Sequence, residues 1–247
     1  MRDELREEIP AWLREADPLA ASRIARAYSV DPPSRRAYVP LVRAHPRAVK
    51  RALKAPVPED RLLAVTITTA AGFRHLREHG WLGPERDRTD VDLRLAYDWI
   101  RWQMVRRIPS ARGRYPLWLW PAVNSTWRDT IGYAEHGDVV LVVSVPRADV
   151  LLSDFDGWHS VINLWPAFPV ECSTCGTPDC DDHDAAWPKL EWPTVASHDV
   201  VSLTPGWNDI FDSTRHAEES MQITCEFVFA DWVVAALEVR RARRRRA

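Results

Sequence analysis

Three of the four cysteines lie in one short stretch that also contains a histidine. Cys172, Cys175, Cys180 and His183 follow a Cys-x2-Cys-x4-Cys-x2-His spacing. Zinc binds four nitrogen or sulfur ligands in a tetrahedron, and a Cys-x2-Cys turn supplies two of them. We therefore predict a structural zinc site, since four protein ligands leave no open position for a catalytic water. The alternative is a set of unpaired thiols in a surface loop.

A second chemical signal is a row of polar residues on a predicted strand late in the sequence. In MQITCEFVF, Gln222, Thr224 and Glu226 share one face, and apolar residues share the other. Polar side chains on an otherwise buried strand cost free energy unless they face a cleft. Glu226 is a candidate catalytic carboxylate. Gln222 can bind a hydroxyl group but cannot accept its proton.

Two further segments could line a binding site. Thr66 and Thr68 alternate onto one face of a β-branched segment, in which Ala64 leaves space beside them. The segment YPLWLWPAV supplies Tyr115 and Trp118 as an aromatic wall. The chain has 13 Trp, more than its 5 Tyr or 6 Phe. This excess either fills the core or stacks on a planar ligand.

His159 is the candidate proton carrier, because the unperturbed pKa of histidine is about 6.5. It lies in SDFDGWHSVIN, where Asp154, Asp156 and Asn163 gather polar groups around Trp158. This cluster is either part of a site or a hydrogen-bonded corner of the fold. Similarly, the polar residues of the segment 103–107 are either functional or the exposed face of a helix.

The elements that position these residues are segregated into helical and strand-rich parts, which favours an α+β fold over a doubly wound sheet. Residues 1–60 are rich in Ala, Arg and Pro and predict a small helical region. An α+β core follows over residues 61–239. We expect strands near 62–68, 115–123, 139–146 and 150–154, a helix ending at Gly80, and a long helix from Asp90 to Ile108, before Pro109. Residues 166–206 look like an insertion that holds the cysteines.

Composition excludes several classes of protein. With 46% hydrophobic and 28% charged residues and a net charge of -2, the 247-residue chain is typical of a soluble globular protein. We expect no membrane span and no secretory signal, and hence a cytoplasmic location. Six arginines in residues 240–247 predict a disordered basic tail. The motifs of nucleophile-elbow hydrolases, Rossmann folds and P-loops are missing.

Four segments together resemble an uncharacterised bacterial family, the domain of unknown function 3841. They are AYDWIRWQMVRR, YPLWLW, VLLSDFDGWHSVIN and the later MQITCEF. The resemblance covers about residues 62–238 and leaves out the first sixty residues and the cysteine insertion. The family name implies no activity.

The order of these elements is more distantly similar to the ADP-ribosyltransferase superfamily. That resemblance implies two small split sheets around a cleft that binds NAD. Thr66 and Thr68 would then anchor the cofactor, and Tyr115 and Trp118 would stack on the nicotinamide. The position of the carboxylate that holds the ribose 2′-hydroxyl is occupied by Gln222, with Glu226 further along. The first and last of these strands should be neighbours, so that the residues converge on one concavity.

Three functions are open at this point. The first is transfer of ADP-ribose from NAD to a nucleic acid or protein acceptor, in a toxin or defence setting. The alternative is a non-catalytic, zinc-containing module that binds a nucleotide or nucleic acid, with the terminal arginines adding non-specific attraction. The third is a structural protein whose N-terminal helices dock on a partner.

Overall fold

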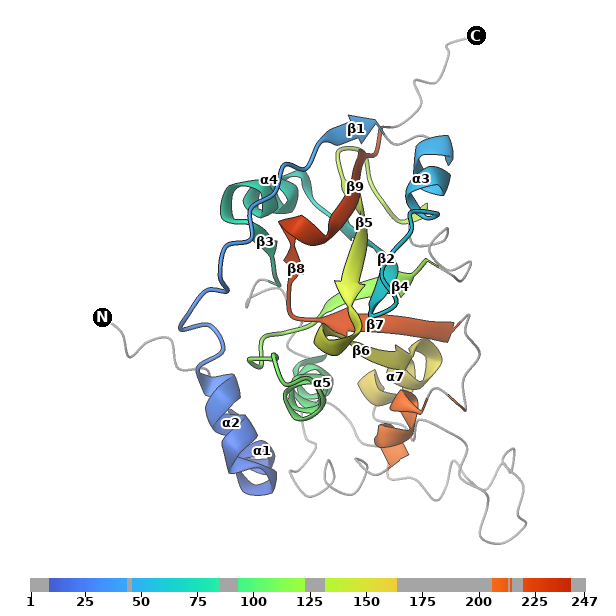
Figure 1. Ribbon diagram of the computed structural model, residues 1–247. Coiled ribbons are helices and arrows are strands. Elements are labelled where there is room, and N and C mark those ends of the chain that lie inside the picture. Colours follow the sequence, from blue (N-terminus) through green and yellow to red (C-terminus); the bar gives the residue numbers. More distant parts are fainter. Residues whose placement is uncertain are drawn as a thin grey trace, which may run out of the picture.

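The computed structural model describes residues 9–43, 46–84, 93–122, 132–163, 206–212, 214 and 220–240. Its strands form a seven-stranded sheet in the order β1-β9-β5-β2-β4-β7-β6 and a two-stranded ribbon, β3-β8 (Figure 1). The strands are β1 (Leu41–Arg43), β2 (Arg61–Thr68), β3 (Trp81–Leu82), β4 (Leu117–Pro121), β5 (Val139–Pro146), β6 (Leu151–Asp154), β7 (Met221–Cys225), β8 (Val228–Phe229) and β9 (Val233–Glu238). The α-helices are α1 (Ala11–Ala16), α2 (Pro18–Ala25), α3 (Pro46–Ala52), α4 (Ala70–His79), α5 (Arg94–Arg107) and α7 (Phe155–Ile162). Short 3-10 turns are η3 (Arg147–Asp149), η4 (Asn208–Phe211) and η6 (Ala230–Trp232).

The predicted α+β class is confirmed, whereas the expected pair of split sheets is not. The sheet is continuous because β4 pairs antiparallel with β2 on one side and with β7 on the other. All pairings in the large sheet are antiparallel except that of β1 with β9. Figure 1 shows that β7 runs steeply across the direction of β5, as expected of a strongly twisted sheet.

Strand β5 lies inside the sheet, between β9 and β2, and is buried on both faces. Its run of valines and leucine pairs with all eight residues of β2 on one side and with β9 on the other. Leu141 and Val143 pack into a core together with residues of α4, β8 and η6. Val140 and Val142 face the opposite core, which includes Val49 of α3. The apolar run in the sequence thus corresponds to a strand that is covered on both faces.

Helix α5 is buried almost all round, because layers of structure cover it on several sides. On one side the helices α1 and α2 pack against it, and Trp12 meets Trp102 edge to face with ring centres 5.6 Å apart. The Trp102 indole N–H also donates to Asp17, which caps α2. On another side Trp99 contacts Trp207 and Phe211. The polar residues of this helix therefore include members of the core.

The first sixty residues contain the expected helices and also one strand. Strand β1 lies at the edge of the large sheet, where Leu41 pairs with Ala236 and Arg43 with Glu238. Helix α3 packs near the same strand, β9. The described part of this region is therefore built into the fold of the rest. Of the basic tail, only Arg240 is among the described residues.

No helix in the described part of the chain is both long and apolar enough to cross a membrane.

Candidate functional site

A cavity of about 430 Å³ lies where strand β2 ends and helix α4 begins. Its lining includes three threonines, Thr66, Thr68 and Thr69. It also includes three aromatic residues, Tyr97, Tyr115 and Trp118. We refer to it as the threonine cavity. It brings together all four residues that were expected to bind a cofactor.

Strand β2 and helix α4 hold the three threonines in place. Thr66 and Thr68 pair with Leu141 and Val139 of β5, so the ladder fixes both side chains on one face. The Thr66 hydroxyl donates to the backbone carbonyl of Trp118 at 2.9 Å, which ties β2 to β4. Thr69 caps α4, because its hydroxyl accepts from the backbone N–H of Gly72.

Gly72 is needed at this corner for reasons of space. A side-chain carbon at this position would overlap the Thr68 hydroxyl. The glycine therefore lets the first turn of α4 approach the end of β2 closely. As a result, two threonine hydroxyls lie beside a helix N-terminus, an arrangement that favours anionic groups.

The aromatic wall is centred on Tyr97, which projects from α5. Its ring meets those of Tyr115, Trp118 and Trp158 edge to face, at centroid distances of 6.2, 6.3 and 5.6 Å. Burial raises the pKa of the Tyr97 phenol, and a hydrogen bond with Trp118 acts in the opposite direction. Tyr97 was not predicted as a site residue, because on this helix it shares a face with the core residues Ala96 and Ile100.

One carboxylate lies among the described residues of the threonine cavity. Asp138 immediately precedes β5, and its Oδ2 accepts from the backbone N–H of Glu135 at 2.8 Å. No motif in the sequence pointed to Asp138. Its proximity to the threonines follows from the pairing of Val139 with Thr68.

Gln222 is not among the residues that line the threonine cavity, and the order of the strands explains why. Strand β4 separates β2 from β7, so the two strands are not the neighbours that the resemblance implied. Val65 pairs with Trp120, and Trp118 pairs with Thr224, so Gln222 shares a face with Val65 and lies opposite to Thr66.

The amide of Gln222 is sealed inside the protein. Gln222 is 2% exposed and pairs across the strands with Ser153, which is fully buried. The Nε2 of Gln222 and the hydroxyl of Ser153 have no hydrogen-bond partner in the described part of the chain. Two buried polar groups without partners cost stability. Because both side chains are buried, this polar row is not open to a substrate.

Glu226 is engaged by a loop of the backbone and also lies outside the threonine cavity. Its carboxylate accepts from the backbone N–H groups of Arg112 at 2.7 Å, Arg114 at 2.8 Å and Gly113. Burial raises the pKa of Glu226, against the effect of these hydrogen bonds and of the Arg114 charge. Glu226 therefore organises the loop that follows α5, and it lines a second, smaller cavity.

His159 is exposed on α7 and is not among the residues that line the threonine cavity. Its Nδ1 lies 2.9 Å from the carbonyl oxygen of Phe155, and its ring packs against the Phe155 ring. Nearby, Asp154 caps α7 by accepting from the Gly157 N–H at 2.6 Å, and it also accepts from the Ser220 hydroxyl. Of the two interpretations of this cluster, these contacts favour the hydrogen-bonded corner.

The predicted zinc ligands Cys172, Cys175, Cys180 and His183 all lie outside the described residues. Within the described ranges, no group of three or more His, Cys, Asp or Glu side chains could hold a metal ion. Cys225, on β7, is a buried free thiol whose pKa is raised, chiefly by burial.

Comparison with known proteins gives one family match. The model of a family described as a domain of unknown function (DUF3841) matches residues 85–167. No curated protein and no solved structure matches the chain. The matched segment contains Tyr97, Tyr115 and Trp118 but neither Thr66 nor Thr68. The chain is thus similar to this family over the segment that supplies the aromatic wall of the cavity.

Proposed function

We propose that the threonine cavity binds a nucleotide, with NAD as the first candidate. The observation that carries this proposal is that three threonines and three aromatic residues are among the residues that line one cavity of about 430 Å³. Aromatic side chains bind the planar face of a base or a nicotinamide. Hydroxyls beside the start of α4 suit ribose and phosphate oxygens. The volume is also within the range of small-molecule sites, about 300–1,000 Å³.

Binding without chemistry is the function that this geometry supports best. Transfer of ADP-ribose needs an acidic group beside the ribose, to stabilise the positive charge that develops as the nicotinamide bond breaks. Gln222, Glu226 and His159 are not among the residues that line the cavity. We therefore favour the non-catalytic alternative, because none of the three expected catalytic residues lines the cavity.

Transfer to a nucleic acid or protein acceptor is retained as a second candidate, because Asp138 places a carboxylate at the same cavity. In this version Asp138 takes the role that the resemblance gave to a residue of the late strand.

Calorimetric titration with NAD, ADP-ribose and AMP tests the binding proposal. We expect saturable binding to the wild-type protein and about tenfold weaker binding to Thr68→Val, an effect of about 1.4 kcal/mol. Thr68→Val removes a hydroxyl while keeping the shape of the side chain. Thr214→Val is the matched control, since Thr214 is exposed and does not line the cavity. The absence of binding by all three compounds would exclude the proposal.

Incubation with labelled NAD and cell extract tests the second candidate. Transfer by the wild-type protein, lost in Asp138→Asn while NAD still binds, would support it. NAD binding with neither nicotinamide release nor labelled product would leave the binding function alone.

The zinc-containing part of the binding hypothesis is tested separately. We expect elemental analysis to give about one zinc per chain, and Cys175→Ser to lose it. Metal-free protein whose cysteines all titrate as free thiols would contradict the zinc site.

A further inference from the structure

The cavity beside Glu226 is a second site, independent of the nucleotide proposal. Its volume is about 140 Å³, and it shares no lining residue with the threonine cavity. We propose that it binds a small aliphatic zwitterion, of the chemical class of a free amino acid such as leucine. Three features of its lining carry this inference: an apolar wall, two guanidinium groups and one carboxylate with a free oxygen.

The apolar wall is formed by side chains from both the helical and the strand layers. Met104 and Ile108 come from the end of α5, and Phe227, Phe229 and Trp232 come from the region of β8 and η6. A cavity of about 150 Å³ holds a ligand the size of benzene. The apolar part of the ligand is therefore a small side chain.

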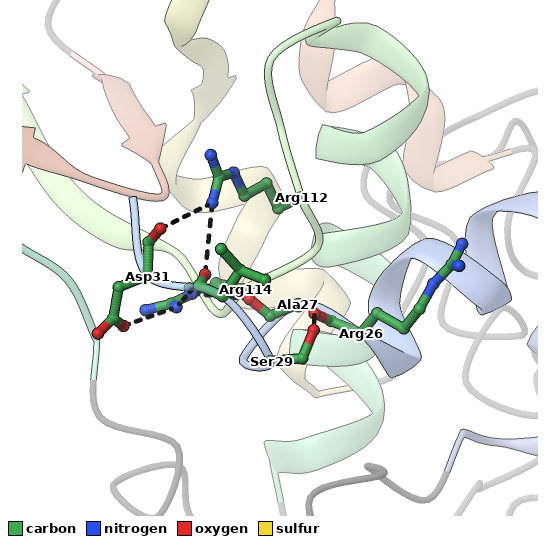
Figure 2. Close-up of polar contacts among 7 residues, drawn as sticks. Arg26, Ala27, Ser29, Asp31, Arg112 and Arg114 are labelled. Atoms are coloured by element: carbon green, nitrogen blue, oxygen red, sulfur yellow. Dashed lines mark hydrogen bonds and ion pairs between the residues drawn. The ribbon is translucent and has the colours of Figure 1, made fainter. Parts of the chain in front are cut away.

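The positive groups are Arg35 and Arg112. Arg112 uses only its Nη1, which donates to the carbonyl oxygens of Val30 and Asp31 at 3.3 Å each (Figure 2). Its other side-chain donors have no partner among the described residues. The Arg35 guanidinium lies over the Phe229 ring at 4.2 Å. A planar guanidinium binds a carboxylate through two parallel hydrogen bonds, so these groups suit the acidic end of the ligand.

The negative group that can reach the ligand is Asp149. Its Oδ1 accepts from the Ser110 hydroxyl at 2.6 Å, which leaves Oδ2 without a partner in the described structure. Glu226 differs, because both of its oxygens already accept backbone N–H groups. An ammonium group beside Asp149 would complete the set of charges. Since both signs are present at the cavity, a simple anion or a simple cation would leave one charge unpaired.

The cavity is held in shape before any ligand binds. One wall is the segment that contains Pro32 and Pro33. The preceding residues are tied down by Arg114, whose Nε donates to the Ala27 carbonyl at 2.9 Å and whose Nη2 donates to Val30 and Asp31 (Figure 2). Glu226 fixes the opposite loop. A preorganised site loses less conformational entropy on binding.

Titration with leucine and two matched analogues tests the proposal. We use 4-methylpentanoate, which lacks the ammonium group, and 3-methylbutylamine, which lacks the carboxylate. Leucine is expected to bind at least tenfold more tightly than either. Equal affinity for leucine and one analogue would overturn the zwitterion assignment, and the absence of saturable binding by all three would overturn the site.

Two variants locate the binding. Asp149→Asn and Arg35→Gln should each weaken leucine binding at least tenfold, while Arg36→Gln, an exposed neighbour that does not line the cavity, should leave it unchanged. Thermal melting shows whether each variant is folded. Binding of leucine unaltered in both variants would contradict the proposal. NAD binding by the same variants reports on the other cavity, so the two proposals fail separately.

Discussion

Two rows of polar residues on strands of the same sheet differ in their accessibility. Thr66 and Thr68 on β2 open onto a cavity, whereas Gln222 on β7 is sealed and Glu226, just beyond it, is bound by a backbone loop. Both rows show the same alternation in the sequence. The pairing of β4 with each strand places them on opposite faces of the sheet. Alternation thus tells which residues of one strand share a face, and only the register between strands tells whether two rows meet.

The largest effect on stability is expected at Glu226. Glu226→Ala removes the acceptor of three backbone N–H groups, and we expect it to lower the free energy of unfolding by about 3 kcal/mol. Nucleotide binding in the threonine cavity should be retained. Urea unfolding measures the first effect and calorimetry the second.

Glu135→Ala is the control, because Glu135 is exposed and, among the described residues, only its backbone takes part in hydrogen bonds. A stability loss in Glu226→Ala no larger than in this control would mean that the loop does not depend on the carboxylate.

A smaller effect is expected at Asp154, at the end of β6. Asp154→Ala should cost about 1–2 kcal/mol, because it removes the N-cap of α7. Asp156→Ala is the matched control from the first turn of the same helix, where the side chain is exposed. Equal losses in the two variants, measured by urea unfolding, would show that the corner does not depend on the cap.

A substitution in the buried polar row of β7 is expected to increase stability. Gln222→Met removes a buried amide nitrogen that has no partner in the described structure. We expect an increase of about 1 kcal/mol in the free energy of unfolding. Thr68→Val on the open row should change stability by less than about 0.5 kcal/mol. A loss of stability in Gln222→Met would show that the amide makes a contact essential to the fold.

The smallest effect is a dependence on pH. Because burial raises the pKa of Glu226 above its ordinary value of 4.5, the folded state binds this proton more tightly than the unfolded state. Its contribution to stability is present below pH 4.5 and is lost as the pH rises through the raised pKa. The stability of the wild type relative to Glu226→Gln should therefore fall over that interval. A pH-independent difference in urea midpoints would contradict this.

Local signals in the sequence predicted β2 and the C-terminal ends of α4 and α5, whereas α5 begins at Arg94, with the expected cap Asp90 outside the described residues, and the segment from Met221 is divided into β7 and β8. The β-branched run before Thr69 forms β2, and α4 ends at Gly80, which has a left-handed φ of 84°. Helix α5 ends at Arg107, with Ile108 as its cap before Pro109. The threonines and two of the three wall aromatics could also be picked out. In each case the information lies within a few residues of the position concerned.

The remainder depends on contacts between distant segments. The capture of Glu226 by residues 112–114 joins parts of the chain that no spacing rule connects. The continuity of the sheet depends on β4, whose short pairings with β2 and β7 are invisible in its own sequence. The polar row of β7 was therefore predicted to face a cleft, although neighbouring elements enclose it.

The short strand β1 has a consequence for aggregation. It pairs with the outer edge of β9 from Ala236 to Glu238, and β5 pairs with the other edge, so this half of β9 has no free backbone edge while β1 is in place. Strand β1 has only three residues, all exposed, and one of them is Arg43. A short, charged strand is a poor template for pairing with another molecule, whereas the longer and more apolar β9 would be a good one. Transient opening of residues 41–43 would thus expose the protein to edge-to-edge association long before its core unfolds.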